Sequence, residues 1–325
     1  MTRFLLRRLA NYVVLCFVAT FLAYTLASKT FHPLDQLIQR NPRPPQSTID
    51  AKAHELHLDQ PLLQRFFTWF GGVLHGNFGT TITDEPVTDE LWRRAGVSLR
   101  LFLLGVLIGV IVGVLVGVIS AVKQYKFTDY FATFLSFLLL STPVFVLAPL
   151  LKSGALALNG SVLPQDWLKF DGEHTQGFTG SLGAELVDRI RYLIVPTITI
   201  AIAQIAYYSR YQRSAMLDVL GSDFLRTAQA KGLTRRRALF KHGLRTALIP
   251  MATLFAFGFG LLIVGGVFTE TIFNWPGMGQ WLVYGIQKQD TNIVATTTLF
   301  VAVCVLISGW LADVLYAALD PRVRI

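Results

Sequence analysis

Residues 101–122 read LFLLGVLIGVIVGVLVGVISAV, an apolar run without one charged side chain. A helix needs about 20 such residues to cross the hydrocarbon core of a bilayer, because each residue adds about 1.5 Å to its length. The core of a soluble protein does not need apolar residues in blocks this long. The stretch therefore predicts a transmembrane helix, and with it an integral membrane protein.

The rest of the chain has the same character, with 53% hydrophobic and only 15% charged residues among 325. A composition this apolar excludes an ordinary soluble domain. A charge at the bilayer centre costs about 2.5–3.5 kcal/mol, so runs free of charge are informative. We expect an all-α membrane protein with six transmembrane helices, at Leu9–Ser28, Leu101–Val122, Phe131–Leu151, Tyr192–Ser209, Ala247–Thr269 and Thr291–Ala312.

The first span has an alternative, because Arg3, Arg7 and Arg8 precede it as they would precede a cleaved signal peptide. The run is longer than a usual signal core, and the cleavage signal at its end is weak. We therefore expect a retained span.

Basic residues fix the expected orientation. Lys and Arg crowd residues 210–246 and also lie near the N-terminus, whereas residues 29–94 are nearly balanced in charge. Because cytoplasmic segments carry the excess of Lys and Arg, we place both termini and residues 210–246 in the cytoplasm. The formal charge of +9 then reflects topology, and no nucleic-acid partner is expected.

Residues 29–96 are too long for a simple connection and form an expected extracytoplasmic segment with short helices. Asp59-Gln-Pro61 predicts a helix start. An apolar stripe follows at four-residue spacing: Leu62, Phe66, Phe70 and Leu74. We expect the stripe to pack on the membrane side of the same protein, with a docking surface for an outer partner as the alternative.

Two groups of glycines mark close helix contacts. The second span carries a ladder at every fourth position: Gly105, Gly109, Gly113 and Gly117. Such a stripe lets another backbone approach, either in this chain or in a second membrane subunit. The fifth span mixes glycine with bulky residues, which suits a helix that packs closely and shifts, or an ordinary crowded helix. Its outer end supplies candidate gate or pathway residues: Gly265, Gly266 and Glu270.

Several kinds of chemistry have no sequence support. No span carries a mid-membrane carboxylate or histidine for ion coupling, and no phosphate-binding GxxxxGK[ST] loop occurs. Catalytic Ser/His/Asp, Cys/His and HExxH groupings are also absent from the sequence. The spacing of His54, His57 and His75 does not suit a metal site. We expect a non-catalytic membrane subunit with no metal or cofactor of its own, so any transport is passive or driven from elsewhere.

The loop at 210–246 has internal structure. Ser222 or Asp223 predicts a helix cap, and Gly232 ends that helix in the left-handed conformation. A second, basic helix is expected from Thr234. A segment lying on anionic lipid would account for the charges but not for the cap and the glycine stop, so we prefer a partner-docking element. Its candidate coupling residues are Asp223, Phe224, Arg226, Thr227, Ala228, Ala230, Lys231 and Gly232.

These residues carry a resemblance. Arg226-Thr-Ala-Gln-Ala-Lys-Gly232, followed by Ala247-Leu-Ile-Pro250, resembles the coupling loop of bacterial binding-protein-dependent ABC permeases, most of all the dipeptide/oligopeptide/nickel branch. Arg-Thr-Ala in place of the general Glu-Ala-Ala is typical of the peptide branch. Further matching stretches are Leu58-Asp-Gln-Pro-Leu62, Gly76-Asn-Phe-Gly79, Thr269-Glu-Thr-Ile-Phe273, Trp275-Pro-Gly-Met-Gly279, Asp313-Val-Leu-Tyr316 and Leu319-Asp-Pro-Arg322. Residues 158–187 match least.

The resemblance implies a type I-like ABC importer permease of the bacterial inner membrane, in which residues 1–28 are the N-terminal tail and first span, 29–96 the extracytoplasmic segment and 97–325 the permease core. It implies ATP-driven import of oligopeptides or dipeptides, with nickel and glutathione as alternatives. The implied partners are a second homologous permease, two cytoplasmic ATPase subunits or domains that bind ATP and Mg, an extracytoplasmic substrate-binding protein and membrane lipid. Without the resemblance, a stand-alone channel, an ion-coupled carrier and a membrane anchor stay open.

Overall fold

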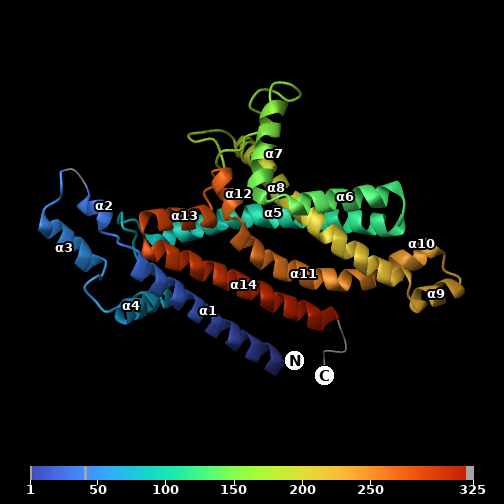
Figure 1. Ribbon diagram of the computed structural model, residues 1–325, viewed down its shortest axis with the longest axis horizontal. Coiled ribbons are helices and arrows are strands. Elements are labelled where there is room, and N and C mark those ends of the chain that lie inside the picture. Colours follow the sequence, from blue (N-terminus) through green and yellow to red (C-terminus); the bar gives the residue numbers. More distant parts are fainter. Residues whose placement is uncertain (1, 40–41, 320–325) are drawn as a thin grey trace.

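The computed structural model describes residues 2–39 and 42–319, and these residues form helices and loops without a β-strand (Figure 1). The long helices are α1 (Thr2–Thr30), α5 (Val87–Val122), α8 (Leu182–Leu220), α11 (Leu244–Gly265) and α14 (Thr291–Leu319). Within the described residues, 4 helices are long and apolar enough to cross a membrane, namely α1, α5, α8 and α14. The number rises to 5 if the bent pair α6 (Phe127–Ser141) and α7 (Val144–Leu158) counts as one span.

The third expected span is not one continuous helix. Pro143 lacks an amide hydrogen and holds Thr142 in an extended conformation, with φ −91° and ψ 114°. Helix α6 therefore ends at Ser141, and α7 leaves it at an angle of 109°. The fifth expected span corresponds to α11 followed by α12 (Val267–Ile272). Many side chains of α11 lie outside the described residues, so six spans stay a prediction.

Helices α5 and α8 form the most extensive helix pair of the described structure. The glycine ladder of α5 faces α8, which identifies its partner as a helix of the same chain. A Cβ added at Gly109 would lie 2.3 Å from Cβ of Gln204, and one at Gly117 would lie 2.5 Å from the carbonyl oxygen of Ser209. Any larger residue at these positions forces the two backbones apart.

The segment 29–96, which is expected to be extracytoplasmic, lies at the end of the bundle away from α9 and α10 (Figure 1). It contains α2 (Asp35–Ile38), α3 (Gln46–Glu55) and α4 (Leu62–Leu74), with α13 (Met278–Lys288) nearby. Phe66 of α4 is fully buried, and its ring centroid lies 4.9 Å from that of Phe21 on α1. Phe66 and Phe70 of the apolar stripe thus pack on this chain, whereas Leu74 at the end of the stripe is 72% exposed. In the same segment the Lys52 ammonium hydrogen-bonds Asp84 and holds the pKa of that carboxyl below its usual value.

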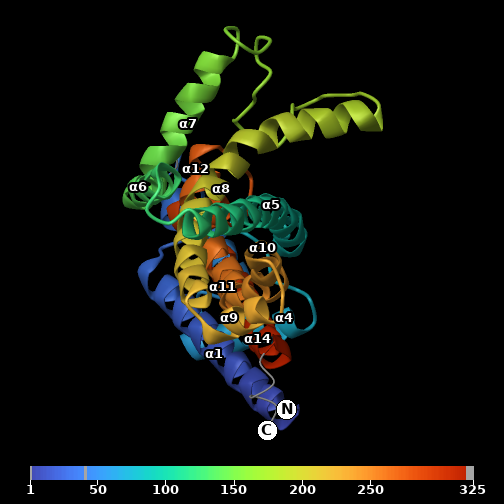
Figure 2. The same cartoon turned by 90° about the vertical axis from the view of Figure 1, so that its right-hand side faces the viewer.

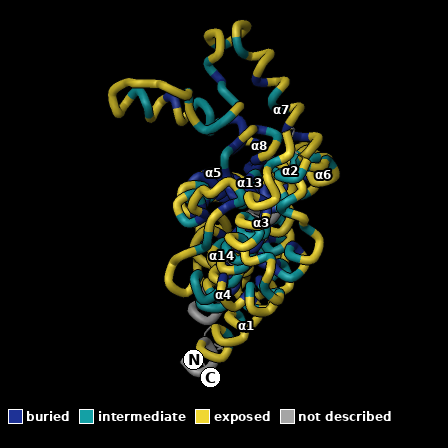
Figure 3. The backbone as a smooth tube through the Cα atoms, turned by 90° about the vertical axis from the view of Figure 1, so that its left-hand side faces the viewer, coloured by how far each residue is buried: buried dark blue, intermediate teal, exposed yellow. Residues whose placement is uncertain are grey.

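Helix α7 and the first turns of α8 project sideways from the bundle (Figure 2). Their surface is largely exposed in Figure 3. The intervening loop is tied to α8 because Lys169 Nζ donates to Asp188 at 2.9 Å and Thr175 Oγ1 donates to the same carboxylate at 2.8 Å. This arm includes residues 158–187, for which the sequence suggests no chemistry.

Candidate coupling site

Helix α9 (Asp223–Ala230) is bounded by local signals that the sequence displays. Ser222 occupies the N-cap position, although its hydroxyl donates back to the Val219 carbonyl at 2.6 Å instead of capping α9. Gly232 adopts φ +93°, in the left-handed region. The amide of Leu233 donates to Ala228 at 3.3 Å and that of Gly232 to Gln229 at 2.9 Å. These two bonds form a Schellman motif, the helix end expected from the glycine.

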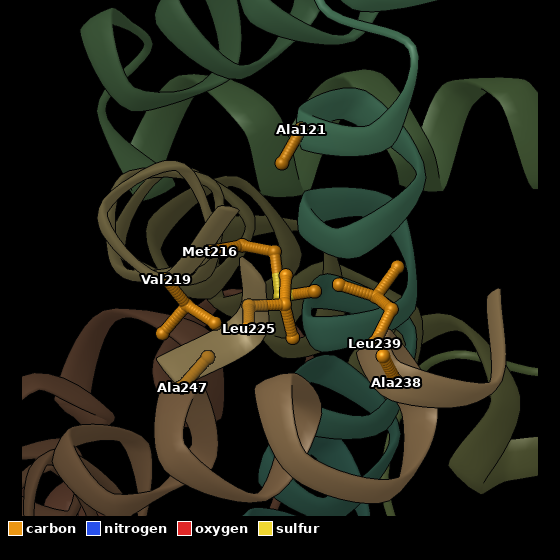
Figure 4. Close-up of a cluster of buried hydrophobic side chains, with 7 residues drawn as sticks. All are labelled: Ala121, Met216, Val219, Leu225, Ala238, Leu239 and Ala247. Carbon is orange, nitrogen blue, oxygen red and sulfur yellow. The ribbon is translucent and has the colours of Figure 1, made fainter. Parts of the chain in front are cut away.

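The inner face of α9 is anchored by one side chain. Leu225 is 2% exposed and is the buried residue of this helix. Figure 4 shows it among apolar side chains from other helices. The cluster consists of Ala121 of α5, Met216 and Val219 of α8, Leu225, Ala238 of α10 (Arg235–Ala238), Leu239 of the π-helical turn η1 (Leu239–Gly243) and Ala247 of α11. A displacement of α9 therefore acts on the ends of α5, α8 and α11 together.

The outer face of α9 carries most of the predicted coupling residues. Those that are exposed are Asp223, Phe224, Arg226, Thr227, Ala230, Lys231 and Gly232. Phe224 leaves 44% of its surface uncovered, although it is a large apolar residue. The Asp223 and Arg226 side chains lie 3.6 Å apart but are too exposed to stabilise the helix strongly. A free apolar side chain flanked by charges is typical of a surface that binds another protein.

Ala228 departs from this arrangement. The sequence places it among the candidate coupling residues, with Thr227 and Ala230, but it packs inward against the cluster around Leu225. Its neighbours Thr227 and Ala230 are exposed. The difference arises because α9 is an amphipathic helix in which residues 225 and 228, three apart, lie on one side. Only the outward-facing residues are available to a partner.

A basic surface adjoins α9. Thr234 caps α10 by accepting a hydrogen bond from the Arg237 amide at 3.3 Å, as its sequence position predicts. The helix has only 4 residues and continues through η1 into α11, so the expected second helix is short. An open depression of about 510 Å³ is lined by Thr234, Arg236, Arg237, Phe240 and Lys241. Its charge favours an acidic partner surface.

A buried ion pair at the same end was not anticipated. Arg213 of α8 donates to both carboxylate oxygens of Asp129, at 2.6 and 2.8 Å, and Asp129 is 2% exposed. Ser120 at the end of α5 donates to the same carboxylate. In the sequence, Arg213 and Asp129 are ordinary charged residues of expected cytoplasmic segments. No local signal reveals their contact, because they lie far apart in the sequence and meet only when α6 packs on α8.

Glu270 forms a second buried cluster at the other end of α5. Its carboxylate accepts hydrogen bonds from the Gly279 amide at 2.7 Å and the Gln280 amide at 3.0 Å, which caps α13. Ser98 also donates to it, and the side chain is fully buried. A Cβ at Gly277 would lie 2.2 Å from Glu270 Oε1. In this structure the buried Glu270 carboxylate joins α12 to α5 and α13 and is not exposed to an open pathway.

The two glycines beside Glu270 differ in what surrounds them. A Cβ at Gly266 would lie 1.8 Å from the ring of Phe102 on α5, so this glycine permits a tight contact. Gly265 is the last residue of α11, and its surroundings lie outside the described side chains. The assignment of Gly265, Gly266 and Glu270 to a gate stays a prediction. Among the described residues, no group of three or more His, Cys, Asp or Glu side chains gathers as metal ligands.

Residues 113–325 match the family described as binding-protein-dependent transport system inner membrane component. The chain belongs to this family. The oligopeptide transport system permease protein OppB of Mycobacterium tuberculosis is 57% identical over 325 residues, with 100% of each chain covered. The oligopeptide transport system permease protein AppB of Bacillus subtilis is 33% identical over 329 residues, again with 100% of each covered. The di/tripeptide transport system permease protein DppB of Pseudomonas aeruginosa is 34% identical over 335 residues, covering 100% of this chain and 99% of that protein.

The chain is therefore a multi-pass permease subunit of an ABC importer in the inner membrane. A binding-protein-dependent system includes a substrate-binding protein and further subunits, so the permease works within a larger assembly. The resemblance seen in the loop before Pro250 is confirmed by a match that includes that whole loop. Helix α9 within this loop is anchored to α5, α8 and α11 through Leu225 and leaves its other face exposed.

Proposed function

We propose that the permease forms half of the translocation pore of an ATP-driven importer of oligopeptides or dipeptides, and that α9 couples it to a cytoplasmic ATPase. The observation that carries the proposal is the two-sided character of α9. Phe224 and Arg226 face outward, whereas Leu225 is held in a cluster that joins α5, α8 and α11. The substrate class rests on the relatives, whose names specify oligopeptides and di/tripeptides.

The proposed topology has six spans and both termini in the cytoplasm. Helices α11 and α12 together form the fifth proposed span, although α11 is not among the helices that are long and apolar enough by themselves. The bent pair α6 and α7 forms the third proposed span. The start of α1 and the basic segment α9–α10 lie toward one end of the bundle, and α2, α3 and α4 lie toward the other (Figure 1). Lys and Arg concentrate at the first of these ends, which is the expected cytoplasmic side.

The proposed partners are a second homologous permease, two cytoplasmic ATPase subunits or domains and an extracytoplasmic binding protein. The ATPases bind ATP and Mg, so the permease itself is non-catalytic and needs no cofactor. When the ATPase pair closes, it displaces the exposed face of α9. Leu225 transmits that displacement to the ends of α8 and α11, and the pore alternates between inward-open and outward-open states.

A bulky substitution on the outward face of α9 tests this coupling. Ala230→Trp should abolish peptide uptake per ATP hydrolysed, because Ala230 is exposed and the new side chain blocks a partner groove without disturbing the apolar cluster. Thr128→Trp is the matched control, since Thr128 is exposed at the start of α6, near the same end of the bundle. The assay is ATP-dependent uptake of a labelled oligopeptide into proteoliposomes that contain the complete transporter and its binding protein.

Two results would contradict the proposal. Unchanged uptake per ATP in the Ala230→Trp transporter would remove α9 from the coupling pathway. Peptide flux through the purified permease alone would favour a channel or carrier over an ATP-driven pore. Replacing the labelled peptide by nickel or glutathione in the same proteoliposomes tests the substrate class separately.

A further inference from the structure

An apolar groove lies between α1, α4 and α14, outside the coupling site. It encloses about 660 Å³ and is lined by apolar side chains only. Its lining includes Leu9, Val13 and Phe17 of α1, Val303 and Trp310 of α14, and Leu74 of α4. Because the indole N–H of Trp310 is the one strong hydrogen-bonding side-chain group among the lining residues, a peptide or another polar solute would lose most of its hydration there without compensation. The occupant must be apolar.

The length of the groove matches one leaflet of a bilayer. Leu9 and Phe17 both line it, and at the rise of an α-helix they are separated by about 12 Å. Leu299 and Trp310 line its other wall and are separated by about 16 Å. Half of the hydrocarbon core is about 15 Å thick. The length of the groove is therefore similar to the thickness of the hydrocarbon layer that one leaflet's lipid tails occupy.

Helix α4 closes the groove near the middle of α1. The ring centroid of Phe70 lies 5.2 Å from that of Phe17, and Phe70 and Leu74 both belong to the lining. Phe17 lies near the centre of the expected span Leu9–Ser28. On its other side α4 leaves Leu63 and Phe67 57% and 58% exposed, as suits a helix bathed in lipid. Helix α4 thus bounds the groove near the bilayer centre, and the groove extends from there to the start of α1.

Two arginines lie at the end of the groove near the start of α1. Arg7 is exposed two residues before Leu9, the first lining residue of α1, and Arg8 donates to Asp313 at 2.8 Å. In the proposed topology this end faces the cytoplasm, where the leaflet is rich in anionic lipid. A lipid whose tail lies between α1 and α14 would place its headgroup beside these arginines. This step rests on the proposed orientation of the permease.

We propose that the groove binds one acyl chain of an anionic phospholipid of the cytoplasmic leaflet. The alternative occupant is a helix of a partner subunit, which is about 10–12 Å across with its side chains. A single extended tail is much thinner, and the arginines at the start of α1 favour its anionic headgroup. The lipid would join the first span, helix α4 and the last span into one unit.

A photoreactive lipid tests the proposal directly. The complete transporter is placed in nanodiscs with phosphatidylglycerol that carries a diazirine in the middle of one tail, irradiated and mapped by mass spectrometry. We expect adducts on residues 9–17, 70–74 and 299–310. Val303→Trp should reduce them about tenfold, the effect of displacing about two methylenes. Val305→Trp is the matched control, because Val305 is exposed on the same helix but does not line the groove.

The headgroup is tested with a second variant. Arg7→Gln should lower labelling by phosphatidylglycerol relative to phosphatidylcholine by about fivefold, the contribution of one basic residue at an anionic surface. Adducts spread evenly over exposed α1 residues such as Leu15 and Leu22 would overturn the proposal. A disulfide between Val303→Cys and a helix of the partner permease would also overturn it. If Val303→Trp does not assemble, the adduct map of the unmodified transporter still decides.

Discussion

Truncation of Leu225 should disconnect α9 from the transmembrane helices while leaving the fold intact. The side chain is 2% exposed in the apolar cluster, and a buried leucine reduced to alanine costs about 2–5 kcal/mol. Helix α9 has only 8 residues, too few to be stable without tertiary contacts. The loss therefore falls on the docking of α9. At about 3 kcal/mol, the docked state becomes about 100-fold less favourable.

Hydrogen exchange measures this undocking. In Leu225→Ala, amides of residues 226–231 should exchange about 100-fold faster, whereas the α5–α8 pair keeps its protection, because only the local opening has changed. Uptake of peptide per ATP hydrolysed should fall in the same variant. Phe224→Ala is the matched control: it removes a comparable apolar side chain that is 44% exposed, so exchange should be unaltered while binding of the ATPase weakens.

Two patterns of exchange would refute this reasoning. If the amides of α9 in Leu225→Ala exchange at the original rate, Leu225 does not hold the helix in place. If exchange rises throughout α5 and α8 as well, Leu225 stabilises the whole bundle. A fall in uptake would then not show that Leu225 transmits the displacement of α9. Normal uptake per ATP despite an undocked α9 would show that force enters the permease elsewhere.

Other substitutions test the remaining contacts, each by the thermal midpoint of the purified permease. Gly232→Ala leaves open space around the new Cβ but strains a residue at φ +93°, so it should lower the free energy of unfolding by about 1–2 kcal/mol. An unchanged midpoint would contradict the left-handed helix stop. Gly109→Ala places a Cβ 2.3 Å from that of Gln204 and should cost about 1–3 kcal/mol; an unchanged midpoint would mean that α5 and α8 separate freely. Arg213→Gln leaves Asp129 buried without its cation and should lower the free energy of unfolding by about 3–5 kcal/mol. Adding Asp129→Asn should restore much of this loss, and no recovery would contradict the ion pair.

Local signals in the sequence predict what depends on neighbouring residues. The run Leu101–Val122 lies within α5, and the stop at Gly232 lies where its glycine indicates, because helix formation and termination are decided within a few residues. Pro143 was also a local signal. Its effect on the third span was missed because the apolar run around it continues without a charge, and apolar length alone does not reveal a bend.

Contacts between distant residues could not be predicted in this way. Ser98 and Glu270 meet because α12 folds back against the outer end of α5, and Arg213 meets Asp129 because α6 packs on α8. The inward orientation of Ala228 likewise depends on what α9 rests upon. Each carboxylate is an ordinary loop charge in the sequence. It gains its role only from the partners that the tertiary structure brings to it.

These buried contacts determine which parts of the permease can respond to α9. Helix α5 is bound to α12 through Ser98 and Glu270, to α6 through Ser120 and Asp129, and along its length to α8 by the glycine ladder. Changing the angle between α5 and α8 would break several of these contacts at once, so the two helices respond as one body. Helix α11 differs at its start: a π-helical turn precedes it, and Pro250 lies in its second turn, whereas Pro196 of α8 lies well inside that helix. A displacement of α9 should therefore rotate α5 and α8 together and be absorbed in the first turns of α11.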